Sequence, residues 1–199
     1  GRWIKTGATW DDLRNSRDVD PDQHQVLLAL EASRHQGGYS YGYRSDALAL
    51  GELRPDVWRL LREAQSLGIE FVAGERVTRR PMGTPVLSDV ANPSFTLDRV
   101  SDSAGSLILT PVLELESEFL PFNYRDLVGN PPHGVALHRG DELLLAPFPR
   151  PLTVEEARLF RVNEPISIPD DDVPVFATGF LPRLRSQLPV RVGQDVQLP

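Results

Sequence analysis

The sequence predicts an α+β fold in which a helical lobe precedes a mainly antiparallel sheet of hairpins and two short C-terminal helices. Three observations support this prediction. Apolar residues recur at helical spacing before residue 80, the apolar period changes from 3.6 to 2 from residue 84 onward, and two further helix starts follow residue 150. We expect a helical lobe over residues 1–80 and a β-rich lobe over residues 81–199, folded as one structural unit.

The first expected helix begins after Asp20. This residue is a suitable N-cap, Pro21 suits the first helical position, and Gln23 stands where a capping box places its second member. The helix should continue until Gly37 and Gly38 stop it.

The second expected helix covers about residues 55–67. Its apolar face follows the spacing i, i+3, i+4, i+7 through four residues: Val57, Leu60, Leu61 and Ala64. Gly68 suits the left-handed residue that ends such a helix, and Ile69 suits the apolar contact of a Schellman motif. Residues 69–72 should then form a strand.

Two hairpins are expected in the β-rich lobe. The first joins strands at residues 95–100 and 106–116, and the second joins strands at residues 134–137 and 142–146. The unbroken apolar run at residues 143–145 indicates a strand that is covered on both faces.

Two short helices are expected near the C-terminus. Thr153 and Glu156 form a capping box for a helix that ends near Phe160. The acidic run at residues 170–172 precedes the other helix, and Pro182 should kink or end it. The apolar face of this second helix is expected to contain Val173, Phe176, Ala177 and Phe180.

Composition excludes several classes of protein. The 199-residue chain contains no cysteine, which excludes disulfide frameworks, thiolate zinc sites, iron–sulfur clusters and cysteine nucleophiles. The mean hydropathy is -0.27 and no apolar run approaches about eighteen residues, so we expect a cytoplasmic chain without a membrane span. The chain begins at Gly1 rather than Met, so we expect a piece of a longer protein.

Charge is distributed unevenly along the chain. The formal net charge is -7; residues 1–80 hold 12 basic and 12 acidic side chains, whereas residues 81–199 hold 9 basic and 16 acidic ones. Proteins that bind nucleic acid unaided usually carry a basic surplus. We therefore expect any nucleic-acid contact in the first eighty residues, and we expect the acidic half to be a docking surface.

We assign none of the common motifs for nucleotide binding, metal binding or nucleophilic catalysis to this sequence. The motifs considered are the GxxxxGK[ST] phosphate loop, GxGxxG, HExxH, GxSxG and the EF-hand loop. We therefore assign no catalytic, cofactor-binding or metal-binding residue, and we expect no cofactor in this chain.

Three groups nevertheless contain the residue types of catalytic or metal sites. Glu114, Glu116 and Glu118 alternate, which on one strand places three carboxylates on one face. His133 has the chemistry of a general base, and residues 170–172 have the oxygen ligands of a cation site. For these groups we favour structural roles: a solvated strand face, a histidine without a catalytic partner, and aspartates that stabilise a helix N-terminus.

Two segments have the chemistry of nucleic-acid contacts. The candidate residues are Tyr39, Tyr41, Tyr43, Arg44, Arg76, Arg79 and Arg80. In extended form the three tyrosine rings share one face, on which bases can stack. The last three arginines form the densest basic cluster, and guanidinium groups match phosphate oxygens. The alternatives are tyrosines packed against the protein and arginines that are solvated or paired with acidic residues.

Several short blocks of sequence occur in a recognisable order. In the C-terminal half they are VGNPPHGV at 128–135, LLLAPF at 143–148, ISIP at 166–169, FLPRL at 180–184, VRV at 190–192 and VQLP at 196–199. This order resembles the region before the motor in bacterial Swi/Snf-family ATPases, which are often described as DEAD/DEAH-box helicases. GRWIKTGATW at 1–10 resembles the segment after the SWIM zinc finger of the actinobacterial members, and WRLLREA at 58–64 resembles a helix of the same region.

The resemblance implies a parent protein that couples ATP hydrolysis to translocation on duplex DNA. The motor, with its ATP and Mg, would then lie beyond Pro199 and the zinc ligands before Gly1, and no catalytic residue of the family falls on this chain. We therefore expect a non-catalytic accessory domain that positions or restrains the motor, with the motor and DNA as its partners.

Two alternatives stay open. One is a stand-alone protein-interaction module, whose acidic half docks onto a basic surface. The other is a small metal-dependent hydrolase that uses Glu114, Glu116, His133 or residues 170–172.

Overall fold

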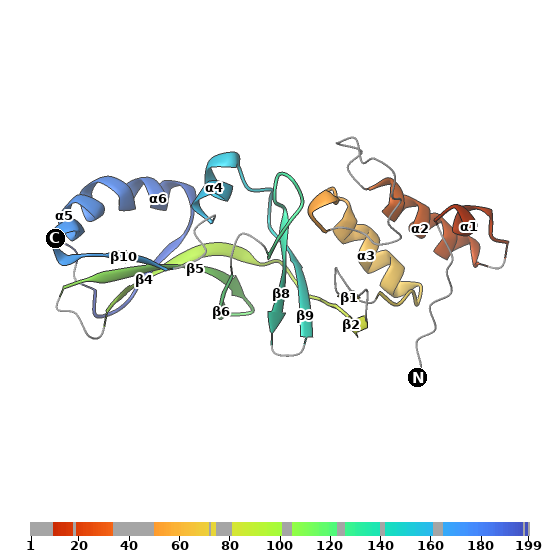
Figure 1. Ribbon diagram of the computed structural model, residues 1–199, viewed down its shortest axis with the longest axis horizontal. Helices are drawn as coiled ribbons and strands as arrows, with labels where there is room; N and C mark the ends of the chain where they lie inside the picture. Colours follow the sequence, from red (N-terminus) through yellow and green to blue (C-terminus); the bar gives the residue numbers. More distant parts are fainter. Residues whose placement is uncertain are drawn as a thin grey trace. The chain divides into compact units, whose positions relative to one another are not determined.

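Helices form the N-terminal part of the chain and strands most of the remainder, as the computed structural model shows (Figure 1). The structure describes residues 10–17, 19–33, 50–71, 73–74, 81–100, 105–122, 126–139, 142–160, 165–196 and 198. The strands pair mostly antiparallel and short helices follow them, so the predicted α+β class is confirmed. The chain forms two compact units: a helical unit of residues 1–85 with 128–130, and a sheet unit of residues 86–127 with 131–199.

The helical unit is built around a pair of packed helices. Its elements are α1 (Trp10–Asn15), α2 (Pro21–Ala32), η1 (Leu50–Glu52), α3 (Val57–Ser66), β1 (Ala73–Gly74) and β2 (Pro81–Gly83). Helices α2 and α3 pack together, and β1 pairs antiparallel with β2. The strand predicted at residues 69–72 is wrong at residues 69–71, which are irregular, and residue 72 lies outside the described residues.

Helix α2 begins where the sequence predicts. The Asp20 carboxylate accepts a hydrogen bond from the backbone N–H of Asp22 at 2.9 Å, which confirms Asp20 as the N-cap. Gln23 does not complete a capping box. Instead, its side-chain Nε2 donates to the Leu67 carbonyl at 2.8 Å and ties the start of α2 to the end of α3.

The end of α2 comes earlier than predicted, at Ala32 rather than near residue 37. Ser33 is buried, and its Oγ donates to the Asp56 carboxylate at 2.8 Å just before α3. The Arg54 guanidinium donates to the Ala32 carbonyl at 2.6 Å. Hydrogen bonds to the segment before α3 therefore stabilise the end of α2. The sequence had instead predicted that Gly37 and Gly38 end this helix.

Helix α3 confirms the prediction made from its spacing. The predicted apolar positions are all buried, together with Trp58. Gly68 has a φ of 75°, and the N–H of Ile69 donates to the Ala64 carbonyl at 2.9 Å, as in a Schellman motif.

The sheet unit contains two sheets and a set of short helices. One sheet has the order β10-β5-β4-β11, with β6 also paired to β5, and the other has the order β3-β9-β8-β7. The bounds of these strands are β3 (Val86–Leu87), β4 (Asn92–Arg99), β5 (Leu107–Leu115), β6 (Glu118–Pro121), β7 (Leu127–Val128), β8 (Gly134–Arg139), β9 (Glu142–Pro147), β10 (Ile166–Ile168) and β11 (Val190–Val192). The helices are α4 (Val154–Leu159), η3 (Asp170–Asp172), α5 (Val173–Val175), η4 (Phe176–Phe180) and α6 (Leu181–Gln187).

Both predicted hairpins are present. Strands β4 and β5 pair antiparallel from Asn92 opposite Glu114 to Arg99 opposite Leu107, and β8 pairs antiparallel with β9. Strand β9 lies between β3 and β8, and Leu144 and Leu145 are both buried. This agrees with the prediction of a strand that is covered on both faces.

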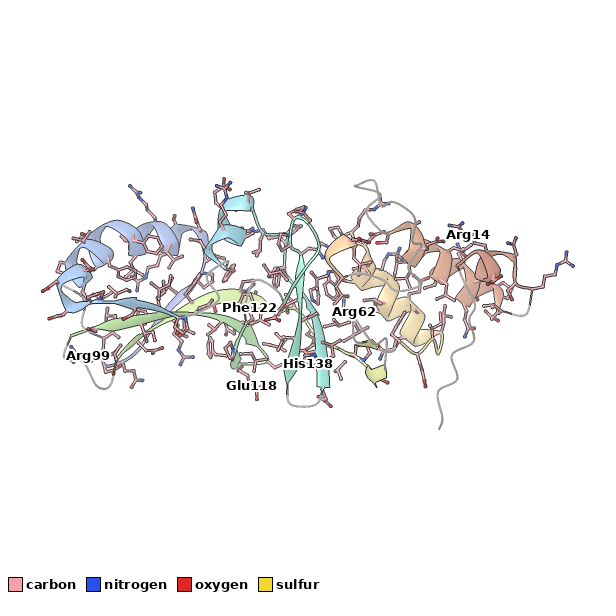
Figure 2. The ribbon with its side chains drawn as sticks, in the orientation of Figure 1. Arg14, Arg62, Arg99, Glu118, Phe122 and His138 are labelled. Carbon is pink, nitrogen blue, oxygen red and sulfur yellow. The ribbon has the colours of Figure 1, made fainter. Side chains whose placement is uncertain are left out.

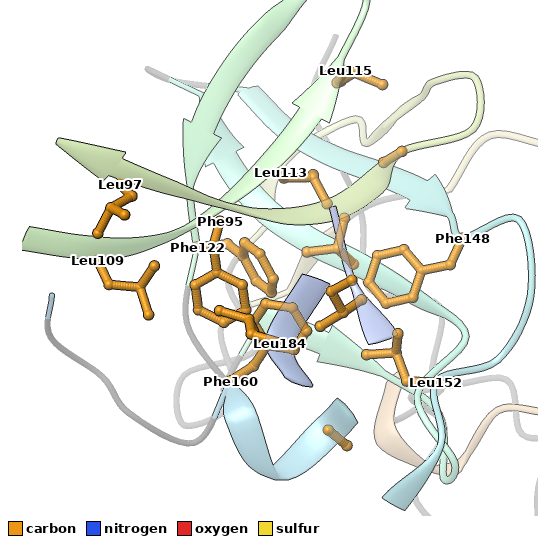
Figure 3. Packing of buried hydrophobic residues seen from close by; sticks show 14 of the residues in the cluster. Phe95, Leu97, Leu109, Leu113, Leu115, Phe122, Phe148, Leu152, Phe160 and Leu184 are labelled. Atoms are coloured by element: carbon orange, nitrogen blue, oxygen red, sulfur yellow. The ribbon is translucent and has the colours of Figure 1, made fainter. Parts of the chain in front are cut away.

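The core of the sheet unit joins its strands to its helices (Figure 3). The rings of Phe95 and Phe160 are stacked with centroids 5.1 Å apart, and the Phe122 ring lies 5.0 Å from that of Phe160. Leu181 and Leu184 of α6 belong to the same buried cluster. Helix α6 therefore packs its apolar face against the sheet.

The C-terminal helical run differs from the prediction at its centre. Elements η3, α5, η4 and α6 follow one another without a break over residues 170–187. Element η4 is a turn of π-helix, which takes up one residue more than an α-helical turn. Two turns after Val173, the extra residue places Leu181 rather than Phe180 on the buried face. Leu181 is 2% exposed and Phe180 is 43% exposed. The prediction that Phe180 shares the buried face is wrong for this reason.

Two further expectations concern this run. Pro182 was expected to kink or end the helix; it does not end it, because it lies in the first turn of α6, directly after the irregular turn η4. The π-helical turn widens the helix where the proline ring would otherwise meet the Thr178 carbonyl. Residues 170–172 form the first turn, η3, rather than preceding the helix, and Asp172, the N-cap of α5, makes no side-chain cap hydrogen bond. The Asp172 carboxylate can therefore act on the helix N-terminus only through its dipole.

Candidate functional site

The candidate nucleic-acid residues all lie outside the described part of the chain. They are Tyr39, Tyr41, Tyr43, Arg44, Arg76, Arg79 and Arg80. Described arginines of the helical unit contact their own unit: Arg14 pairs with Glu31 at 2.7 Å, and Arg59 pairs with Glu63 at 2.7 Å (Arg14 is labelled in Figure 2). The nucleic-acid hypothesis therefore rests on the two candidate segments and gains no support from these arginines.

Ser40, which lies between two of the candidate tyrosines, belongs to a motif that the sequence analysis did not assign. Gly38-Tyr39-Ser40-Tyr41-Gly42 matches the pattern GxSxG, in which the serine is a nucleophile on a sharp strand-to-helix turn. The segment lies outside the described residues, and the described element before it is the helix α2 rather than a strand. Within the described residues, no strand of the kind that a nucleophile elbow requires precedes the pattern.

The three alternating glutamates do not share one strand face. Strand β5 ends at Leu115, Glu116 and Ser117 form a tight turn, and Glu118 begins β6 opposite Leu115 (Figure 2). Glu116 and Ser117 have φ values of 50° and 72°, so the chain reverses between the second and third glutamates. The predicted array of three carboxylates on one strand is therefore wrong.

The histidines and the acidic run occupy separate places. His133 is 3% exposed before β8, and its backbone carbonyl accepts from the Phe148 N–H at 3.0 Å. His24 lies on α2, and among the described residues its buried Nε2 has no hydrogen-bond partner. Residues 170–172 are exposed on η3. Within the described ranges, no three His, Asp or Glu side chains come together in a group that could hold a metal ion.

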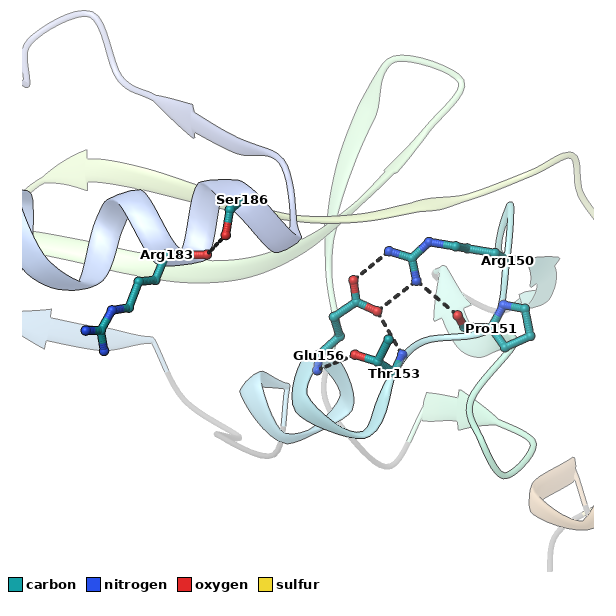
Figure 4. Close-up of polar contacts among 6 residues, drawn as sticks. All are labelled: Arg150, Pro151, Thr153, Glu156, Arg183 and Ser186. Carbon is teal, nitrogen blue, oxygen red and sulfur yellow. Dashed lines mark hydrogen bonds and ion pairs between the residues drawn. The ribbon is translucent and has the colours of Figure 1, made fainter.

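The best-defined polar cluster of the sheet unit surrounds Glu156 (Figure 4). The Arg150 guanidinium donates to both carboxylate oxygens of Glu156, at 2.6 and 2.8 Å. The same carboxylate accepts from the Thr153 backbone N–H at 2.8 Å, while the Thr153 hydroxyl accepts from the Glu156 N–H at 3.2 Å. The predicted capping box is confirmed, but the sequence analysis missed Arg150, whose contact depends on the bend of the chain before α4.

The hydrogen bonds from Arg150 hold the pKa of the Glu156 carboxyl below its ordinary value, against the opposing effect of burial. The carboxylate is 3% exposed and has its hydrogen bonds filled by its own chain, whereas the Arg150 side chain is 56% exposed. A carboxylate occupied in this way cannot also serve as a general base. The cluster stabilises the start of α4.

An exposed apolar surface lies on the C-terminal helical run. The Val175 side chain is 72% exposed and Phe180 is 43% exposed. The Phe180 ring lies 5.7 Å from the half-buried ring of Phe176. Gly179 and Pro182 are the residues whose presence within a helical pattern could have indicated an irregular turn here.

Comparison of the sequence with models of protein families, with curated proteins and with solved structures finds no match. Among the described residues, no helix combines the length and the apolar character needed to cross a membrane. The function is therefore argued from the residues and the fold.

Proposed function

We propose that this chain is a non-catalytic accessory domain of a Swi/Snf-type ATP-dependent DNA translocase, where it positions or restrains the motor. The resemblance of the ordered sequence blocks supports this proposal. One structural observation adds to this support: most of the described acidic side chains of the sheet unit are exposed.

Among the described carboxylates of the sheet unit, Glu156 alone is buried, and it is paired with Arg150. Asp89, Glu116 and Glu155 are exposed on three different segments. A surface with this excess of negative charge repels a DNA backbone and attracts a basic protein face. A motor that grips DNA offers such a face, because it must carry basic side chains to contact phosphates.

The first experiment adds the 199-residue chain to the separately expressed motor of the parent ATPase. We expect the chain to bind the motor, to change its DNA-stimulated rate of ATP hydrolysis, and to be released as NaCl concentration rises. The chain alone, with ATP and duplex DNA, should hydrolyse no ATP. Reproducible hydrolysis by the chain alone would contradict the accessory role, and binding that is unaffected by salt would contradict the acidic docking surface.

A pair of matched variants tests which charges matter. Neutralising Asp89→Asn, Glu116→Gln and Glu155→Gln together should weaken motor binding about tenfold at low salt. The control neutralises three carboxylates of the helical unit, Asp22→Asn, Glu63→Gln and Glu70→Gln, which changes the net charge equally. Equal loss of binding by both variants would show that net charge, rather than the surface of the sheet unit, determines the interaction.

A further inference from the structure

The C-terminal helical run carries an exposed apolar patch with opposite charges on its two sides. Val175 and Phe180 form the patch, and the Phe180 ring contacts that of Phe176, with centroids 5.7 Å apart. The Asp172 carboxylate lies one turn before Val175, and the Arg183 guanidinium lies one turn after Phe180; both side chains are exposed. Figure 1 shows α5 and α6 of this run above β4 and β10.

The π-helical turn creates the patch. In a regular α-helix Phe180 would follow Val173 on the buried face, whereas the extra residue of η4 transfers that place to Leu181. A phenylalanine thereby remains partly in water, and its exposed ring is available to a partner. Such irregular turns are often found at functional positions.

Gly179 is a second and independent observation at the same place. A Cβ atom at this position would have no neighbour within 4 Å among the described residues, and Gly179 is not among the residues with a positive φ. Neither packing nor backbone conformation within the chain therefore requires glycine. Glycine in a helix costs about 1 kcal/mol relative to alanine. A glycine next to an exposed apolar patch allows the backbone of another helix to approach closely.

The charges are arranged symmetrically about the patch. The pairs Asp172 with Arg183 and Val175 with Phe180 have the same midpoint, between Ala177 and Thr178. If a second copy of this helix lies antiparallel across that midpoint, Asp172 faces the partner's Arg183 and Val175 faces the partner's Phe180. The antiparallel arrangement also sets the two helix dipoles in opposite directions, which is favourable.

We propose that residues 170–187 pair antiparallel with the same residues of a second copy, which makes the chain a two-fold symmetric dimer. One self-complementary surface then serves both subunits, as in most dimers with two-fold symmetry. The pairing buries the two apolar side chains of each copy and sets the opposite charges at the rim. This inference goes beyond the proposed function and does not depend on it.

Sedimentation equilibrium of the full 199-residue chain tests the proposal. A single helix pair is a small interface, so we expect a monomer–dimer equilibrium with a dissociation constant of order 10 µM. A chain that stays monomeric up to about 500 µM, far above that constant, overturns the proposal.

Charge reversal identifies the surface. Asp172→Arg alone and Arg183→Asp alone each place like charges opposite one another, and each should weaken self-association at least about tenfold. An equimolar mixture of the two variants should dimerise with near wild-type affinity, because every facing pair in the mixed dimer is again of opposite charge. Asp171→Arg is the control, since it makes the same charge change in the same turn on another face of the helix.

A further variant tests the apolar contact of the proposed dimer. Gly179→Leu should abolish dimerisation by blocking close approach, without lowering the melting temperature of the monomer, because that position is open within the chain. Wild-type dimerisation by Gly179→Leu, or failure of the mixed charge variants to associate, would overturn the proposed pairing.

Discussion

Glu156 shows how a single buried carboxylate is accommodated in this protein. Among the described residues it is the only buried Asp or Glu, and its oxygens accept from the guanidinium of Arg150 and the N–H of Thr153. Arg150 itself is largely exposed, so the pair adds little as an ion pair in water. The value of Glu156 lies in the hydrogen bonds that it makes at the start of α4.

Glu156→Ala should lower the free energy of unfolding by about 2 kcal/mol. The substitution removes the capping box and leaves the Thr153 N–H without its acceptor. Urea denaturation followed by circular dichroism measures the change. Glu155→Ala is the matched control, because Glu155 is exposed in the same turn, and it should change the free energy by less than about 0.5 kcal/mol. Equal effects of the two substitutions would contradict the role given to Glu156.

The depressed pKa of Glu156 predicts how this contribution depends on pH. A carboxyl group whose pKa is lower in the folded chain than its ordinary value of 4.5 stabilises the fold above that value and loses this effect as the pH falls through the folded pKa. The difference in unfolding free energy between the wild type and Glu156→Gln should therefore be constant from about pH 7 to pH 5.5 and shrink below about pH 4.5. A difference that grows on acidification would contradict the depressed pKa.

At the scale of elements, the turn between β5 and β6 is the clearest departure from local preference. Glu116 and Ser117 both have positive φ values, although neither is glycine or asparagine. Alternation of the glutamates predicted a continuous strand here, because a two-residue reversal carries no sequence signal when its residues are Glu and Ser. The pairing of β5 with β6, in which Leu113 lies opposite Leu120, fixes the reversal instead.

Replacing this turn with the residues that such turns favour should stabilise the protein. The double substitution Glu116→Asn, Ser117→Gly should raise the free energy of unfolding by about 1 kcal/mol, because both positions have left-handed backbone. Ser106→Gly, before β5 and without a positive φ, is the control and should give no stabilisation. Thermal melting of the three proteins makes the comparison. If Ser106→Gly raised the stability by the same amount, the conformation of the turn would not be the cause of the stabilisation.

The C-terminal helical run is a second element in which packing overrides a local sequence pattern. Sequence spacing correctly indicated a helix after residue 172 and a buried Val173. It placed Phe180 inside because it assumed 3.6 residues per turn throughout, whereas the run includes a turn of π-helix. Packing of Leu181 and Leu184 into the core selects that turn, and no local rule ranks it above the regular helix.

At the scale of the whole molecule, charge separates the two halves of the sequence. Residues 1–80 are neutral in sum and include every candidate nucleic-acid residue, whereas residues 81–199 carry the whole net charge of -7. The prediction of DNA contact, which stays untested, is therefore confined to the N-terminal half.

Replacing Arg76, Arg79 and Arg80 by alanine in one variant should weaken the binding of duplex DNA, whatever the base sequence of the DNA. If each arginine contacts one phosphate, the slope of log affinity against log salt should fall in magnitude by up to about 2.7. Fluorescence anisotropy over a range of NaCl concentrations measures both quantities. The control replaces Arg99, Arg158 and Arg185 of the sheet unit, which removes the same charge and should leave the slope unchanged. Unchanged binding by the first variant would rule out these arginines as the contact.

Features that depend on neighbouring residues could be predicted from the amino-acid sequence. The Asp20 cap, the Schellman motif after α3, the capping box at Thr153 and both hairpins follow from spacing and local hydrogen bonding, and all are present. The end of α2, the reversal at Glu116, the Arg150 contact with Glu156 and the exposure of Phe180 were not predictable in this way. The end of α2 depends on partners distant in sequence, whereas the reversal at Glu116 and the Arg150 contact depend on how the chain bends locally. The exposure of Phe180 depends on the competition of two apolar residues for one buried position, and packing decides it only when the chain has folded.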